Sequence, residues 1–220
     1  MSLNYTGYFI TPIYEQKIDK WIKPLNKACD KHIKEARKKD IPFIKKRNKD
    51  FKKNLKDFGL SAHSGSLSGL PKFKEIEEYV IKCSDKILDQ MGYNTQGYKM
   101  FMTEMWVQEF SKNGAGHHET HIHYDNHISG FYFLKGSNKT SYPIFKDPRL
   151  AKIMSSLPEK NPWDTTFASH AIKYHPEPGT LILFPSFLEH GFPLDHGIEP
   201  FRFMHFNLQA VRKTIVDKWK

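Results

Sequence analysis

Cysteine is scarce in this 220-residue chain, and long apolar runs are missing. Cys29 and Cys83 lie far apart and near no second pair of metal-ligating side chains, which argues against a thiolate zinc site and favours a reducing compartment. The N-terminus has no basic head followed by an apolar stretch, and no run reaches the length of a membrane helix. We therefore expect a soluble, cytoplasmic protein without a signal peptide.

Internal repeats and low-complexity stretches are also missing, which argues against solenoid and disordered proteins. Hydrophobic residues make up 39% of the chain and aromatic residues 14%, enough for a substantial core. A length of 220 residues suits one large domain. We expect a single domain spanning residues 1–220.

The positive charge is confined to one segment. Residues 17–57 hold 16 lysines and arginines against six acidic residues, whereas the rest of the chain is balanced. Such a segment forms either a solvated helix face or a contact for nucleic acid or another polyanion. Because aromatic residues are few there and no base-reading motif accompanies the charge, we favour the solvated face and keep a weak polyanion contact as the alternative.

The N-terminal third has the spacing of helices. Apolar residues fall three and four apart over residues 18–36, where Pro24 predicts either a kink or a helix start. A shorter helix is expected within residues 43–59. Pro71 then begins a further helix that Gly92 ends. We expect residues 1–94 to be a helical, basic support region.

After residue 94 the pattern changes to short aromatic and β-branched runs between Gly, Pro, Asn and Asp. These runs predict strands over residues 98–110, 127–135, 141–147, 170–175, 180–185 and 200–211. The sequence therefore predicts a mainly β protein with α-helices, in which helices pack against a β-sandwich or barrel.

Five histidines and two carboxylates crowd into the short segment HHETHIHYDNH. They are His117, His118, Glu119, His121, His123, Asp125 and His127. Side chains two positions apart on a strand point the same way, so either His121 with His123 or His123 with Asp125 would face one site. His190, which follows the apolar strand in LFPSFLEH, is the best third ligand. Three such ligands suit oxygen-activating iron(II), and the residues alone leave hydrolytic zinc open.

The surroundings of these histidines resemble a known family. HIHYDNHISGFYFL, FKDPR, PEPGTLILFPSFLEH and FRFMHFN occur in that order. The set is similar to the putative 2-oxoglutarate/Fe(II)-dependent oxygenases of the prolyl-hydroxylase-like superfamily. Their pattern is a His-x-His pair, a Ser-Gly-x-Tyr-Tyr strand, Asp-Pro-Arg, a Phe-Pro-Ser strand leading to a distal His, and a closing Arg-x-x-x-x-Phe-Asn strand. The resemblance implies a double-stranded β-helix (jelly-roll) over residues 95–212, supported by the N-terminal helices.

The resemblance also implies roles for single residues. His121, His123 and His190 take the metal-ligand positions. Arg202, twelve residues after His190, takes the position that pairs with the far carboxylate of 2-oxoglutarate. A guanidinium suits that role because it forms two parallel bonds with a carboxylate.

Two hydroxyls are candidates for contact with the cosubstrate, those of Ser129 and Tyr132. Strand alternation lets only one of them face inward. We favour Ser129, with Phe131 and Phe133 on the same side.

One departure from the superfamily concerns the second ligand, since most relatives have His-x-Asp. Here the aligned residues are His121, Ile122 and His123. Either the site has three histidines, or the pair is shifted to His123 and Asp125. The position of the Ser-Gly strand favours the three-histidine site. A carboxylate ligand would lower the net charge of the iron centre, which favours the shifted pair. We predict His121, His123 and His190, with Asp125 as the reserve ligand.

The resemblance implies an oxidoreductase that uses Fe(II), 2-oxoglutarate and O2. Such a dioxygenase would hydroxylate a C–H bond of a peptide side chain, a nucleobase or a small metabolite, releasing succinate and CO2. The alternatives are a non-catalytic jelly-roll that binds metal or carbohydrate, and a basic polyanion-binding module.

Overall fold

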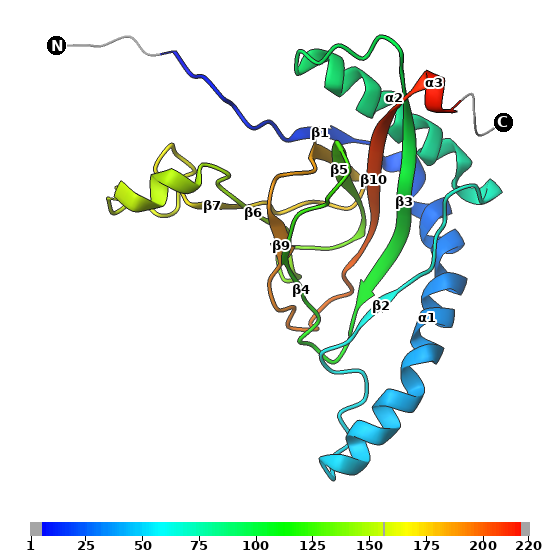
Figure 1. Cartoon of the computed structure of the whole chain (residues 1–220). Coiled ribbons are helices and arrows are strands. Elements are labelled where there is room, and N and C mark those ends of the chain that lie inside the picture. Colours follow the sequence, from blue (N-terminus) through cyan, green and yellow to red (C-terminus); the bar gives the residue numbers. More distant parts are fainter. Residues whose placement is uncertain (1–5, 156, 217–220) are drawn as a thin grey trace.

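Two antiparallel sheets make up the β-rich part of the chain in the computed structural model, which describes residues 6–155 and 157–216 (Figure 1). The larger sheet contains, in spatial order, β1 (Tyr14–Lys17), β8 (Thr180–Pro185), β5 (Ile128–Lys135), β10 (Arg202–Arg212), β3 (Tyr98–Phe110) and β2 (Ser61–His63). The smaller sheet contains β4 (His118–His121), β9 (His190–Phe192), β6 (Ile144–Lys146) and β7 (Ala171–Lys173). The expected mainly β protein with helices is therefore confirmed.

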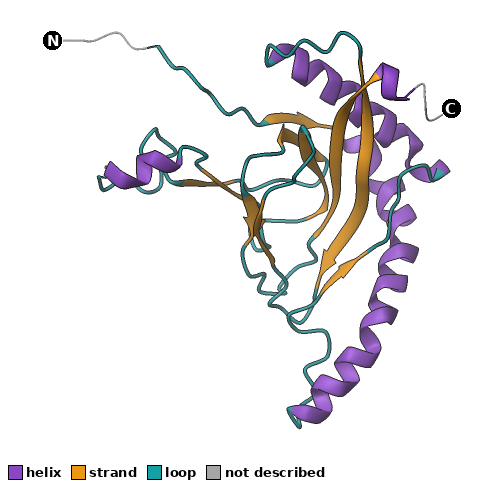
Figure 2. Ribbon diagram, in the orientation of Figure 1, coloured by secondary structure: helices purple, strands orange, loops and turns teal. Residues whose placement is uncertain are grey.

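Helices cover one face of the larger sheet, and the smaller sheet covers part of the other (Figure 2). The helices are α1 (Ile22–Asp50), α2 (Lys74–Gln90) and the short α3 (Lys213–Val216), with 3-10 turns at η1 (Asp19–Trp21), η2 (Pro71–Phe73) and η3 (Leu150–Ser155). Among the described residues, no helix is both long and apolar enough to cross a membrane.

The expectation of two separate helices in residues 18–59 was wrong, since α1 runs without a break from Ile22 to Asp50. Pro42 lies inside α1. It removes one backbone hydrogen bond, and the helix continues through it. Pro24 is the third residue of α1, where a backbone N–H has no partner within the helix. Of the two readings of Pro24, a helix start is the correct one.

Strand alternation sends the side chains of β10 to two different cores. Met204, Phe206 and Leu208 pack with residues of α1 and α2. Phe203 packs on the opposite face, in an aromatic cluster that the smaller sheet covers. We call this second face the inner face of the larger sheet. Alternate side chains on β3, β5 and β10 therefore face either the helices or the smaller sheet.

Candidate metal centre

Three imidazoles converge between the sheets. His121 ends β4 and lies directly opposite His190, which begins β9. His123 belongs to the turn after β4, where its backbone N–H donates to Ser186 O over 3.1 Å. One nitrogen from each of the three rings lies within 4.8 Å of the others. The predicted pairing of His121 with His123 thus comes from a turn and not from strand alternation.

Hydrogen bonds at Nδ1 orient two of these rings. His121 donates Nδ1–H to Glu119 O over 2.7 Å, and His190 donates Nδ1–H to Leu188 O over 2.8 Å. Each ring is therefore held in the tautomer that leaves a lone pair on Nε2. His190 Nε2 is buried and has no hydrogen-bond partner among the described residues. Metal-binding histidines are usually fixed in this way through their second nitrogen.

His123 is held by a side-chain amide. Asn207 Nδ2 lies 2.9 Å from His123 Nδ1 and 2.8 Å from Glu104 Oε2, while Asn207 Oδ1 accepts a hydrogen bond from Ser129 over 2.7 Å. In this arrangement His123 Nδ1 accepts. A half-turn of the amide would let His123 donate Nδ1–H and free Nε2 as a ligand, and it would also require Glu104 to move away from the amide oxygen. Asn207 therefore controls the tautomer of His123.

Burial keeps these imidazoles neutral. Burial, with a smaller contribution from the neighbouring histidines, lowers the pKa of His190 to about 3 and that of His123 to about 4. A neutral imidazole with a free nitrogen is the form that binds a metal ion. The orphaned Nε2 of His190 and the set of three nitrogens fit a divalent transition metal such as iron(II).

Asp125, the reserve ligand, lies outside the set of three. It is exposed and sits in the turn with a positive φ of 60°. A second group of potential ligands overlaps the first and consists of Glu104, His123 and His205. The geometry thus favours His123 over Asp125, and it adds a carboxylate that the sequence did not single out.

Arg202 does not reach the imidazoles, contrary to the expectation that it faces the cosubstrate. Its guanidinium lies on the helix side of β10, where it donates to Glu109 Oε2 over 2.7 Å and to Asp30 Oδ1 over 2.8 Å. Asn26 accepts a further bond. Only 3% of Arg202 is exposed, so these partners occupy it fully. Arg202 links β10 to β3 and α1.

A one-residue difference in spacing explains this placement. Three residues separate Arg202 from Phe206-Asn207, one fewer than in the Arg-x-x-x-x-Phe-Asn pattern. A shift of one residue moves a strand side chain to the opposite face of the sheet. Phe201 occupies the place in the sequence that the pattern gives to the arginine, and its ring belongs to the inner aromatic cluster.

The two candidate hydroxyls point in opposite directions, as strand alternation required. Tyr132 faces the helices and donates to Ile18 O over 2.6 Å, which excludes it from the space between the sheets. Ser129 faces inward with Phe131 and Phe133 and is bonded to Ser186 and Asn207. Ser129 supports the amide that holds His123.

The space beside the imidazoles is lined by aromatic rings. Its cluster of eleven buried hydrophobic side chains holds eight phenylalanines among the described residues. His205 lies on the inner face of β10, with its ring 4.7 Å from that of His123 and 4.3 Å from that of Trp106. His118 on β4 lies 4.6 Å from His121, ring to ring. Neither His118 nor His205 was predicted as a ligand. His205 lies two residues before Asn207 and therefore on the same, inner face of β10.

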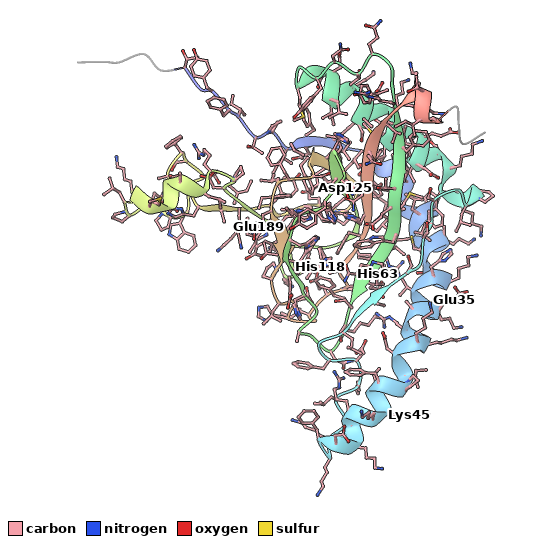
Figure 3. All side chains as sticks on the ribbon, in the orientation of Figure 1. Glu35, Lys45, His63, His118, Asp125 and Glu189 are labelled. Carbon is pink, nitrogen blue, oxygen red and sulfur yellow. The ribbon has the colours of Figure 1, made fainter. Side chains whose placement is uncertain are left out.

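Figure 3 shows His118 on β4 and His63 on β2, the strands at one edge of the space between the sheets. His63 packs against Trp106 with ring centroids 4.1 Å apart. Trp106 thus has an imidazole on either side, His63 and His205. His63, His118 and His205 therefore surround one buried tryptophan beside the three candidate ligands.

Solved structures of other proteins share this fold in part. AviO1 from Streptomyces viridochromogenes Tue57 aligns with a TM-score of 0.54 and 10% identity, over 90% of each chain. The collagen prolyl hydroxylase vCPH of Paramecium bursaria Chlorella virus-1 aligns with a TM-score of 0.51 and 12% identity, over 96% of this chain and 99% of that one. A 2OG-Fe(II) oxygenase family oxidoreductase from Burkholderia pseudomallei aligns with a TM-score of 0.45 and 12% identity, over 66% of this chain and 59% of that one. At such identities the likeness shows the fold alone.

No curated protein matches the chain significantly. A family model does match it over residues 104–206, and its description is "Putative 2OG-Fe(II) oxygenase". The matched range contains all three converging histidines. Residues 104–206 are therefore similar to the family of putative 2OG-Fe(II) oxygenases.

Proposed function

We propose that this chain is an Fe(II)- and 2-oxoglutarate-dependent dioxygenase that hydroxylates a C–H bond of a peptide side chain, a nucleobase or a small metabolite, with release of succinate and CO2. The family match over residues 104–206 supports iron(II), 2-oxoglutarate and dioxygen as its cofactors. The observation that carries the proposal is the convergence of His121, His123 and His190 within 4.8 Å. The two sheets would form the double-stranded β-helix of one domain, with residues 95–212 as its core. Residues 1–94, expected to be a helical support, also supply β1 and β2, the two edge strands of the larger sheet.

The residues of the chain would divide the work between holding the metal and shaping its surroundings. His121, His123 and His190 would hold iron(II), which supplies the oxidative chemistry. Asn207 and Ser129 would keep His123 oriented. The phenylalanines around Phe131 would exclude water from the side of the metal that faces the larger sheet.

The proposal is tested with chelator-stripped protein that is reloaded anaerobically with iron(II). Addition of 2-oxoglutarate should produce a weak visible charge-transfer band, and admission of air should convert 2-oxoglutarate to succinate. Zinc should occupy the site without supporting that conversion. Equal activity with zinc in a hydrolytic assay, or iron binding without any response to 2-oxoglutarate, would favour a hydrolase or a non-catalytic metal-binding protein instead.

A further inference from the structure

Aromatic side chains are exposed at the far end of α1, which extends beyond both sheets (Figure 1). Phe43 and Phe51 lie four residues before and after Arg47, and therefore on one stripe of the helix and its end. The Arg47 guanidinium lies 5.3 Å from the centre of the Phe43 ring and donates to Phe58 O over 2.7 Å. In chain order the three phenylalanines are 53%, 70% and 47% exposed. Residues 41–58, which we call the α1 tip, thus hold three exposed rings around one arginine.

The lysines of the α1 tip have no partners of their own. Residues 41–56 contain Arg47, six lysines and one acidic residue, Asp50. Within the described part of the chain, the six ammonium groups form no hydrogen bond or ion pair; they belong to Lys45, Lys46, Lys49, Lys52, Lys53 and Lys56. α2 differs, because it combines three lysines with five carboxylates. A solvated helix face would account for the lysines of the α1 tip but not for the exposed rings between them.

The chemistry of the α1 tip matches an anionic lipid bilayer. Lysines beside exposed rings bind such a surface, because the cations meet anionic headgroups while the rings enter the boundary between headgroups and acyl chains. The apolar stem of a lysine can lie along lipid while its ammonium stays in water.

Nucleic acid fits the α1 tip less well. Specific contacts to phosphates and bases commonly use arginine, whose guanidinium forms two parallel bonds. Both terminal nitrogens of Arg47 already donate to backbone carbonyls, those of Lys56 and Phe58. The free cations of the α1 tip are therefore lysines, which favours the bilayer.

We infer that the α1 tip binds the surface of an anionic lipid bilayer. Phe43, Phe51 and Phe58 lie among the headgroups of one leaflet, and the six lysines lie against lipid phosphates and carboxylates. Such a contact needs no membrane-spanning helix. It is independent of the proposed function, since Figure 3 shows Lys45 near the end of α1, away from His118 beside the candidate metal centre.

The test measures co-sedimentation of the full chain with vesicles of phosphatidylcholine, alone or mixed with phosphatidylserine. Wild type should sediment with the mixed vesicles and stay in solution with phosphatidylcholine alone. Phe43→Ser and Phe51→Ser together should weaken binding on the order of a hundredfold, about tenfold for each ring removed from the lipid. Tyr93→Ser is the control, because Tyr93 follows α2, is 54% exposed and should contribute nothing.

The contribution of charge is tested separately. Alanine at Lys46, Lys49 and Lys53 should weaken binding on the order of a hundredfold, because each lysine near an anionic surface contributes about fivefold. Alanine at Lys72, Lys82 and Lys86 is the matched control, since it removes the same net charge from α2 and the turn before it. Added salt should weaken binding of wild type and of the phenylalanine variant equally, and that of the α1-tip lysine variant less.

Four outcomes would overturn the inference. Wild type that stays in solution with the mixed vesicles would remove the bilayer as partner. Equal losses in the two lysine variants would reduce the contact to attraction by net charge, and unchanged binding in the phenylalanine variant would exclude insertion of the rings. Tighter binding to a single-stranded oligonucleotide than to vesicles, lost in the phenylalanine variant, would assign the α1 tip to nucleic acid. None of these outcomes changes the iron(II) and 2-oxoglutarate test of the proposed function.

Discussion

At the scale of single residues, the tautomers of the histidines decide what the site can bind. His121 and His190 are fixed by backbone carbonyls, which cannot change their role as acceptors. His123 is fixed by the Asn207 amide, which can turn over. His121 and His190 therefore already have a free lone pair on Nε2, whereas His123 gains one only after the Asn207 amide turns over.

Substitution of His123 and Asp125 decides the second ligand. His123→Ala should abolish stoichiometric iron(II) binding, measured by metal analysis after anaerobic gel filtration. Asp125→Gly should retain it, because the exposed carboxylate lies outside the set and glycine tolerates the positive φ of that position. Retention of iron after His123→Ala with loss after Asp125→Gly would restore the His-x-Asp pair.

Arg202 should matter for stability. Arg202→Met removes the charge that compensates Glu109, a buried carboxylate that Lys135 and Arg37 also contact. Breaking a buried ion pair typically costs about 3–5 kcal/mol, and urea unfolding at neutral pH should show a loss of that order. Lys20→Met is the control, because the Lys20–Glu75 pair is exposed and its removal should not change stability measurably. If Arg202→Met unfolds at the same urea concentration as wild type, then Lys135 and Arg37 alone compensate the charge of Glu109.

Glu109 also makes the free energy of unfolding depend on pH. Burial raises the pKa of Glu109, but the charges of Arg202, Lys135 and Arg37 outweigh it, so the net pKa is lowered. A lowered carboxylate pKa stabilises the fold above the unfolded-state pKa, and this stabilisation is lost as the pH falls through the folded-state value. As the pH falls below about 4.5, wild type should therefore lose more stability than Arg202→Met. Parallel losses in urea unfolding would contradict this coupling.

At the scale of elements, β5 must lie close to its neighbour β8. A Cβ at Gly130 would collide with the Ile182 carbonyl oxygen and the Leu183 side chain. Gly130→Ala should therefore destabilise the protein by about 1–3 kcal/mol in thermal or urea unfolding. Gly65→Ala is the matched control, since nothing lies within 4 Å of its added methyl group. Equal stability of the two variants would mean that β5 and β8 separate without cost.

The basic helix α1 extends well beyond the space between the sheets, and Figure 3 shows Lys45 near its far end, away from His118. Replacement of Lys45, Lys46 and Lys49 by glutamate should leave the uncoupled conversion of 2-oxoglutarate to succinate unchanged. A large loss of that reaction in a variant with wild-type circular dichroism would show that α1 helps to build the site. Contact of residues 17–57 with a polyanion stays a prediction, and a steep salt dependence of binding would test it.

At the scale of the whole molecule, a metal would join the smaller sheet to the turn that contacts the larger one. His121 and His190 belong to β4 and β9, while His123 is bonded through Asn207 to β10. Any ion that binds only the folded state stabilises it, by about 2.7 kcal/mol at a concentration of 100 times Kd. Nickel(II), which does not react with oxygen here, should raise the melting temperature by roughly 5–10 °C. His190→Ala should remove this shift, and an unchanged shift would place the ion elsewhere.

The sequence by itself determined most of the strands after residue 94 and singled out His121 and His190. It did not predict β1, β2 or β9, and it left Pro24 open between a kink and a helix start. Aromatic alternation and flanking Gly and Pro identify strands because both effects are local. His121 and His190 were predicted correctly as neighbours from the ordered motifs around them. The inward direction of Ser129 also followed from counting along one strand.

Only the tertiary structure decided which groups face the metal from other strands. Arg202 and His205 lie three residues apart on β10, and which of them points inward depends on the register of β10 against β3 and β5. Local propensity carries no information on that register, because hydrophobic residues occupy both faces of a strand buried on both sides. The continuity of α1 through Pro42 depends in the same way on packing beyond the helix.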